Sequence, residues 1–340
     1  MSLIRKKKLT KQQTRQIQKN QQALDDSTLA TGLIISHFGK QLDVQLTALP
    51  DTLTTDMASV GDIWRCHARP NLPMLTTGDT VKLSLDTDHG TGIIKQILPR
   101  TTLITRPDRY HKLKPVASNV DILVIVFAPL PKPATELIDR YLLIARLSGV
   151  TPLLVLNKAD ILDECPNALE ILQTYQKLGD KYGFATLLTS QDGQGLEALR
   201  LLIGGRLSVF AGQSGVGKSS LINRLLPDAL QATNVICTNS KLGQHTTTTS
   251  RLLPYDKDDL SQGGIIDTPG IREYGVWHLD SDDILQGFDE LAELSGLCRY
   301  RDCNHAPNAK DCAFWQGVAD GKVSKERLES FLKLLAEAQS

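Results

Sequence analysis

The sequence has few aromatic residues and no long apolar segment. Phe, Trp and Tyr account for 5% of its 340 residues, too few to define a surface for stacking nucleic-acid bases from the sequence alone. A helix that crosses a membrane needs about 18 or more consecutive apolar residues, and no run approaches that length. We therefore expect a soluble protein without a membrane partner.

The sequence also lacks a net charge, with 38 basic and 38 acidic residues, but the charge is unevenly distributed. The first twenty residues contain no acidic side chain and seven basic ones: Arg5, Lys6, Lys7, Lys8, Lys11, Arg15 and Lys19. Because this Gln- and Lys-rich segment has few apolar residues, we expect residues 1–30 to form a basic tail that is disordered in isolation. The tail could neutralise RNA phosphates and fold on binding, or it could serve only to increase solubility.

The most informative pattern is the order of the nucleotide-binding motifs. Residues 212–219 read GQSGVGKS and fit the phosphate-binding pattern G-x-x-x-x-G-K-[ST]. Residues 157–160 read NKAD and fit the N-K-x-D pattern that recognises guanine in GTPases. The phosphate loop normally comes first, whereas here it follows the guanine motif and precedes the threonines at 246–249 and DTPG at 267–270. The motif set is complete but circularly permuted.

The phosphate loop lies between a predicted strand at 206–211 and a predicted helix at 219–226. In that arrangement backbone N–H groups and a helix N-terminus face a polyphosphate, and a Gly-rich turn without a ligand is the alternative. We expect the Lys218 amine to reach the β- and γ-phosphates. The predicted phosphate-binding residues are Gly212, Gln213, Ser214, Gly215, Val216, Gly217, Lys218, Ser219 and Ser220.

The guanine motif directly follows an apolar run at 152–156, which predicts that it lies at the carboxyl end of a parallel strand. The Asp160 carboxylate can accept from the guanine N1–H and exocyclic amine, and adenine offers no matching donors. Residues 189–196 resemble the loop whose backbone N–H meets guanine O6, although a solvent-facing turn would look the same. The predicted base-binding residues are Asn157, Lys158, Asp160, Thr189 and Ser190.

The DTPG motif follows another apolar strand and completes the γ-phosphate and Mg²⁺ sites. We expect the Gly270 N–H to bond the γ-phosphate. One threonine of the 246–249 cluster, Thr247 or Thr248, should bind Mg²⁺ in the GTP state and release it afterwards. The predicted Mg²⁺ ligands are Ser219, Thr247 and Asp267, the last acting through water.

The residue after DTPG bears on the mechanism. Ras-like enzymes place a water-orienting Gln there, and this chain has Ile271, which cannot form a hydrogen bond through its side chain. Another group in the chain or on a partner must therefore orient the water. The nearest candidate is His245, although an isolated histidine is more often structural. The predicted catalytic residues are His245, Lys218 and Thr247.

Four soft or borderline metal ligands lie within fifteen residues near the C-terminus: Cys298, Cys303, His305 and Cys312. This set suits a tetrahedral zinc site with no open coordination position, which makes the site structural. The chain shows no secretory signal and its GTPase motifs indicate a reducing compartment, so disulfides are not expected. Reduced cysteines in a core are the alternative reading.

Hydrophobic patterning predicts an α/β protein with separate terminal modules. A chain of 340 residues allows about two or three domains. Short alternating stretches between 31 and 105 predict a small antiparallel barrel, either a nucleic-acid platform of the OB type or a packing module. Apolar residues at three- and four-residue intervals predict helices at 282–294 and 325–338.

Together these motifs resemble the RsgA/YjeQ family of circularly permuted small ribosomal subunit biogenesis GTPases. The resemblance rests on the permuted order, GQSGVGKS at 212–219, GQHTTT at 243–248 and the Cys₃His set, and it spans nearly the whole chain. It implies an N-terminal OB-fold β-barrel at 31–108, a circularly permuted P-loop GTPase domain at 109–278 and a small α-helical zinc-binding domain at 279–340.

The resemblance also implies a function. Members of this family hydrolyse GTP to GDP in late maturation of the small (30S) ribosomal subunit, so it implies binding to that subunit and its 16S rRNA, stimulation by the subunit, one structural Zn²⁺, Mg²⁺ with GTP, a monomer and a cytoplasmic location. Two other functions stay open: a nucleotide-switch RNA-binding adaptor whose hydrolysis is incidental, and an RNA-binding zinc protein with a vestigial nucleotide site. The complete motif set argues against the vestigial site.

Overall fold

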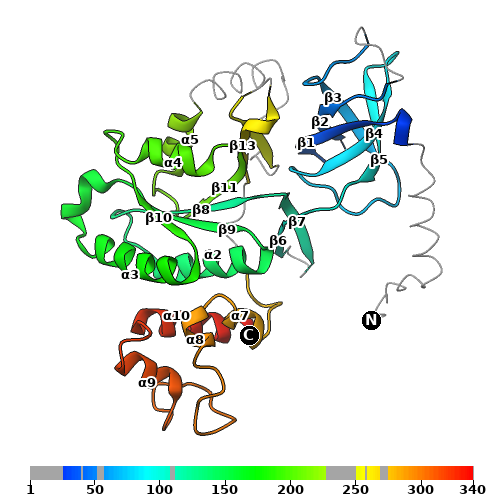
Figure 1. The fold of residues 1–340 in the computed structure, drawn as a ribbon. Coiled ribbons are helices and arrows are strands. Elements are labelled where there is room, and N and C mark those ends of the chain that lie inside the picture. Colours follow the sequence, from blue (N-terminus) through cyan, green and yellow to red (C-terminus); the bar gives the residue numbers. More distant parts are fainter. Residues whose placement is uncertain are drawn as a thin grey trace.

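The structure, a computed structural model, describes residues 26–39, 41–51, 57–107, 112–226, 250–256, 259–268 and 275–339. A β-barrel leads into a parallel sheet with helices on both faces, and a small helical part follows at the C-terminus (Figure 1). This confirms the predicted α/β class with an N-terminal barrel. The segment 1–25, which contains most of the predicted basic tail, lies outside the described residues. Within the described ranges, no helix has the length and apolarity that a membrane crossing requires.

The barrel contains the strands β1 (Ala30–Phe38), β2 (Gln41–Ala48), β3 (Ile63–Ala68), β4 (Thr80–Asp86) and β5 (Thr91–Ile97). Their order is β1-β2-β3-β5-β4, and pairing of β4 with β1 closes the barrel. The prediction of an antiparallel barrel is wrong at one pair, because β3 and β5 run parallel. Alternate side chains point inward, as the pleat requires, so that Ile34, Val44, Val81 and Ile94 are completely buried.

The central sheet has the strand order β10 (Ala185–Leu188), β9 (Thr151–Leu156), β8 (Ile122–Phe127), β11 (Arg206–Gly212), β13 (Gly263–Asp267) and β12 (Arg251–Pro254). All neighbours are parallel except β12 and β13. Every residue of β8 is buried because helices cover both faces. One face carries α2 (Thr135–Ser148) and α3 (Asn167–Tyr182), and the other carries α4 (Leu196–Ile203) and α5 (Lys218–Leu225) (Figure 1).

Backbone pairing joins the barrel to the central sheet. Strand β1 pairs with the outer edge of β12 at Ser36 and Arg251, which makes one sheet of 11 strands. Beside this pair, the Thr77 hydroxyl donates to the Ser250 carbonyl at 2.9 Å, and the Ser250 hydroxyl donates to the Val116 carbonyl at 3.0 Å. The Val116 carbonyl belongs to the hairpin of β6 (Leu103–Pro107) and β7 (Leu113–Ser118), which connects the two parts.

The C-terminal part contains the short helices α7 (Ser281–Leu285), α8 (Asp289–Ala292) and α9 (Ala313–Ala319), followed by α10 (Lys325–Ala338). The predicted helix at 325–338 is confirmed. The predicted single helix at 282–294 is wrong, because the chain turns at Gly287 between α7 and α8. The Gly287 backbone packs so closely on α2 that a Cβ there would lie 2.8 Å from the Leu143 Cβ.

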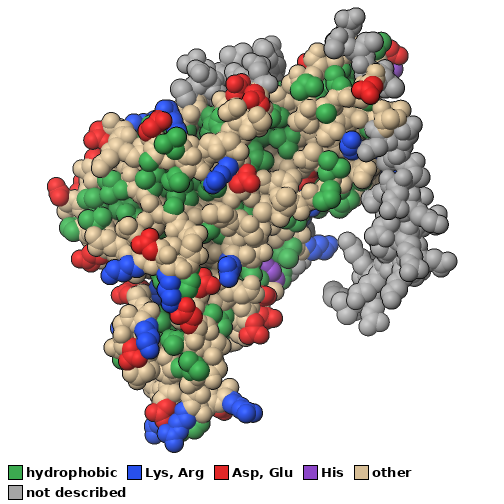
Figure 2. All heavy atoms as spheres, in the orientation of Figure 1, with side chains coloured by type: hydrophobic (Ala, Val, Ile, Leu, Met, Phe, Trp, Pro, Cys, Tyr) green, Lys and Arg blue, Asp and Glu red, His purple; other side chains and the backbone are tan. Residues whose placement is uncertain are grey.

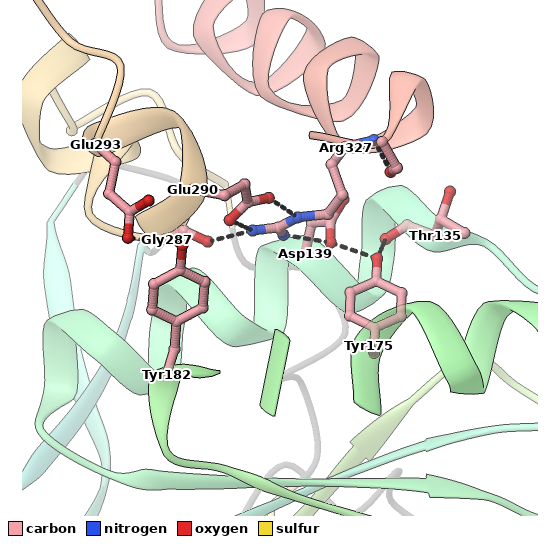
Figure 3. A network of polar contacts seen from close by, with 9 residues as sticks. Thr135, Asp139, Tyr175, Tyr182, Gly287, Glu290, Glu293 and Arg327 are labelled. Carbon is pink, nitrogen blue, oxygen red and sulfur yellow. Dashed lines mark hydrogen bonds and ion pairs between the residues drawn. The ribbon is translucent and has the colours of Figure 1, made fainter. Parts of the chain in front are cut away.

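A buried ionic network fastens α10 to the central part (Figure 3). Arg327, whose side chain is 4% exposed, donates to both carboxylate oxygens of Glu290 at 2.6 and 3.0 Å and to Asp139 at 2.7 Å. Tyr175 donates to the same Asp139 carboxylate, and the Gly287 carbonyl accepts from Arg327 at 3.0 Å. The network joins four helices, and losing one charge would leave its partner buried and unpaired.

Candidate functional site

The phosphate loop connects β11 to α5, as its sequence predicts. Gly212 has a φ of 139°, and a Cβ there would lie 2.0 Å from the Val126 carbonyl oxygen. Gly217 has a φ of 94°, and a Cβ there would lie 2.4 Å from the amide nitrogen of Asn157. Glycine is therefore required at both positions. The Lys218 amine donates to the carbonyls of Gly212 and Gln213 at 2.7 and 2.6 Å, which holds it against the loop.

The guanine motif lies directly against this loop. The Asn157 side chain is buried; its amide donates to the Val216 carbonyl at 2.9 Å, and its oxygen accepts from the Thr189 hydroxyl at 2.9 Å. Lys158 has a left-handed φ of 59°, and its amine donates to the Gly215 carbonyl at 2.7 Å. Segments 157–158, 189–190 and 212–219, separated in sequence, thus meet at one edge of the sheet, where ligands bind in parallel α/β folds.

The base loop, residues 189–196, is held by hydrogen bonds within the loop and to Asp160. The Asp160 carboxylate accepts from the Gln191 N–H at 2.9 Å, and the Ser190 hydroxyl donates to Asp192. The Ser190 N–H donates to the Gln194 carbonyl at 3.2 Å, so contact between a loop N–H and guanine O6 stays a prediction.

Beside the base loop is a cavity of about 310 Å³, lined by Asn157, Lys158, Ser190, Gln191, Gly217, Ser220, Leu221 and Arg224. Five of these are predicted nucleotide-binding residues, and Thr189 lies behind them as the partner of Asn157. Arg224 is not among the nucleotide-binding residues predicted from the sequence, although its position on the helix that follows the phosphate loop could have indicated it.

The predicted Mg²⁺ ligands come from neighbouring elements. Ser219 lies in the first turn of α5, and Asp267 is the exposed last residue of β13, which runs parallel to β11. Both residues therefore lie at the same carboxyl edge as the phosphate loop. The predicted residues His245, Thr247 and Gly270, together with Ile271, lie outside the described residues.

The predicted zinc ligands come together in the C-terminal part. Their four ligand atoms all lie within 4.8 Å of one another: Sγ of Cys298, Cys303 and Cys312 and one ring nitrogen of His305. The Cys298 and Cys312 sulfurs are 3.9 Å apart, and Nδ1 of His305 is 3.6 and 3.4 Å from them. Two sulfurs bound to one tetrahedral zinc would be about 3.8 Å apart, so the residues fit this ion.

The surroundings of the cluster orient its ligands. The His305 ring stacks on Phe314 with centroids 4.0 Å apart, and the His305 carbonyl accepts from the Trp315 indole N–H at 2.9 Å. Burial lowers the pKa of His305, which favours the neutral imidazole that binds metals. Burial raises the pKa of Cys312 to about 11, so a thiolate there needs a nearby positive charge such as a metal supplies.

Comparison with known proteins agrees with this geometry. The chain matches the family model described as RsgA GTPase over residues 97–277. The small ribosomal subunit biogenesis GTPase RsgA of Pseudomonas syringae pv. tomato is 44% identical over 309 residues, which cover 90% of this chain and 85% of that protein. The protein of the same name from Ectopseudomonas mendocina is 45% identical over 308 residues, with coverage of 90% and 85%.

Two solved structures have a similar fold. The crystal structure of YjeQ from Thermotoga maritima has a TM-score of 0.64 and 26% sequence identity, and the match covers 92% of this chain and 99% of that chain. The structure of YloQ, described as a circularly permuted GTPase, has the same TM-score and identity and covers 92% and 95%.

Proposed function

This chain belongs to the RsgA GTPase family, and we propose that it hydrolyses GTP in the biogenesis of the small ribosomal subunit. The observation that carries this proposal is the contact between the guanine motif and the phosphate loop, made by Asn157 with Val216 and by Lys158 with Gly215. Such contacts fix the position of the base-binding motif relative to the phosphate-binding loop. They support a working nucleotide site and argue against a vestigial one.

In this proposal each motif has a separate task. Asp160 accepts from the guanine N1–H and amine, the Lys158 stem lies on the base, and Lys218 contacts the β- and γ-phosphates. Ser219, Thr247 and Asp267 would hold Mg²⁺, which neutralises charge that develops on the phosphates. The γ-phosphate would be bonded by the Gly270 N–H.

For catalysis we assign the orientation of the attacking water to His245, because Ile271 cannot perform it. The small subunit would position His245 for this role, so hydrolysis in its absence is slow. Positioning of a water by a partner-completed site can raise turnover about 10³-fold or more.

The partner in this proposal is the 30S subunit and its 16S rRNA, met by a monomer in the cytoplasm. Exposed Arg65 and His67 lie on the outer face of β3, where an OB-type barrel can contact nucleic acid. Lys and Arg side chains are visible beside acidic ones at the tip of the C-terminal part (Figure 2). In the sequence, exposed Arg299 and Arg301 lie between the cluster residues Cys298 and Cys303. Zn²⁺ bound by the cluster would hold that tip in shape.

The test is GTP turnover with and without purified small subunits. We expect slow basal hydrolysis and stimulation by the subunit of about 10³-fold. His245→Ala should keep its affinity for GTP but lose most of the stimulation, whereas His89→Ala, an exposed histidine on a barrel turn, should behave as the parent. Turnover that does not rise with subunits would favour the nucleotide-switch adaptor. Full stimulation of His245→Ala would contradict only the catalytic role assigned to this histidine.

A further inference from the structure

Arg224 connects the helix after the phosphate loop to the base loop. It lies in the last turn of α5, the helix that starts at Lys218, and its guanidinium Nη1 donates to the Ser190 carbonyl at 3.0 Å. The same side chain lines the cavity between the guanine motif and the base loop. Arg224 thus lies on the element that would hold the phosphates and contacts the loop that would surround the base.

Several features of the base loop are arranged around this contact. Ser190 is only 3% exposed, and its carbonyl also accepts from the Gly193 N–H at 3.4 Å. Gly193 has a φ of 109°, and a Cβ there would lie 3.2 Å from Nη2 of Arg224. The hydrogen bond from the Ser190 hydroxyl and, more weakly, the charge of Arg224 lower the pKa of Asp192. Ser190 and Gly193 of the loop therefore lie close to the Nη1 and Nη2 nitrogens of Arg224.

We propose that Arg224 is a positioning residue for guanine recognition, which holds the base loop at a fixed distance from the phosphate loop. A charged donor on a nearly buried carbonyl makes a stronger hydrogen bond than a neutral one. A loop fixed before the nucleotide arrives loses less conformational entropy on binding, and this raises affinity without a new contact to the ligand. Arg224 acts through Ser190 and does not need to touch the base.

The experiment compares Arg224→Ala with Arg224→Lys and Arg200→Ala. Arg200 is a matched control because it donates to the Arg224 backbone carbonyl at 2.8 Å from α4, and its described side-chain partners are Arg224 and Glu197, neither of which belongs to the base loop. The measurements are GDP and GTP dissociation constants, KM and kcat, thermal unfolding, and preference for GTP over the 2-aminopurine ribonucleoside triphosphate, which lacks O6 and the N1–H.

For Arg224→Ala we expect about tenfold weaker GDP and GTP binding, since losing one charged hydrogen bond costs about that factor. KM should rise more than kcat falls, and the preference for GTP over the 2-aminopurine analogue should shrink. Arg224→Lys, which keeps one charged donor, should recover part of the affinity, and Arg200→Ala should match the parent.

Two outcomes would overturn this assignment. The first is unchanged nucleotide affinity in Arg224→Ala. The second is an equal loss of nucleotide affinity in Arg200→Ala and Arg224→Ala, accompanied by a lower unfolding temperature. That result would mean that Arg224 only stabilises α5. The inference rests on the proposed GTP site. A parent protein that does not bind GTP would contradict the proposed function itself, whereas a parent that binds GTP beside an unaffected Arg224→Ala variant would contradict this inference alone.

Discussion

At the scale of residues, the proposed nucleotide site contains side chains that hold loops together and side chains that we expect to contact the nucleotide. Asn157 is buried and uses its amide on Val216 and its oxygen on Thr189, so it holds the phosphate loop and the base loop together. Asp160 lies one turn further on and accepts only a loop N–H, from Gln191, among the bonds that the described residues show. We therefore expect guanine selectivity to depend on Asp160 more than on Asn157.

Replacing Asp160 with Asn should change the base that is bound. An amide can donate to the extra carbonyl of xanthine and pairs poorly with the guanine donors, so we expect GTP binding to fall by about tenfold or more and xanthosine triphosphate to bind instead. Competition between the two nucleotides measures the change. Asp163→Asn, an exposed acid in the same 3₁₀ turn (Ala159–Glu164), is the control. Equal GTP preference in both variants would exclude Asp160 from base recognition.

At the scale of elements, we expect the segment between α8 and α9 to depend on a bound metal for its shape. Residues 297–312 contain no helix or strand, and His305 holds a left-handed φ of 54°. The neighbouring α10 packs directly on α2, whereas α9 places Phe314 in the same hydrophobic core and contacts Phe331 of α10. Loss of the metal should therefore loosen the loop and α9 but leave α10 in place.

Cys303→Ser, or prolonged chelation, tests this division. We expect loss of one bound zinc per chain, increased proteolysis near residues 297–319 and weaker binding to small subunits, because structural zinc contributes directly to folding free energy. GTP affinity should change less than twofold, since the cluster is outside the nucleotide motifs. Cys165→Ser, at a cysteine outside the cluster, should keep its metal. Purified parent protein without metal would contradict the zinc assignment.

At the scale of the whole molecule, each terminal part is joined to the central part by specific contacts. On one side β1 pairs with β12, whose other neighbour β13 ends at Asp267. On the other side α10 packs on α2, with the Arg327 network inside and an ion pair at its end. In that pair, Arg140 donates to both oxygens of Glu337 at 2.8 and 2.6 Å.

The Arg140–Glu337 pair predicts a pH-dependent stability. The hydrogen bonds from Arg140 lower the pKa of Glu337 in the folded protein, so the stabilisation is present above the ordinary Glu pKa of about 4.3 and is lost as pH falls through the lowered value. Because Glu337 is 38% exposed, Glu337→Gln should cost only about 0.5–1 kcal/mol at pH 7.

Denaturant unfolding of Glu337→Gln and the parent at pH 7 and at pH 3 measures this effect. The difference should shrink at the lower pH, because Glu337 of the unfolded parent is protonated below its ordinary pKa and the ion pair then contributes less to stability. Glu329→Gln, on the same helix but in a more exposed pair with Lys325 at 3.6 Å, should show a smaller effect at both pH values. A difference that grows at pH 3 would show that the ion pair is not its source.

The sequence alone determined the features that depend on local spacing. The glycines of the phosphate loop, the spacing of the four cluster ligands and the range of α10 all follow from residues close together in the chain, because turn geometry, ligand reach and helical periodicity act over a few residues. The permutation was also visible in the sequence, because each nucleotide-binding motif is a short local pattern and their order along the chain can be read directly.

Only the tertiary structure decided which distant residues meet. Arg327 pairs with Asp139 across 188 positions, and Arg224 reaches Ser190 across 34. The turn at Gly287, which divides an apparently continuous helix, exists because the α2 surface lies against that backbone. No local pattern encodes these contacts, since they depend on how whole helices pack, and packing is a property of the surfaces that the folded chain brings together.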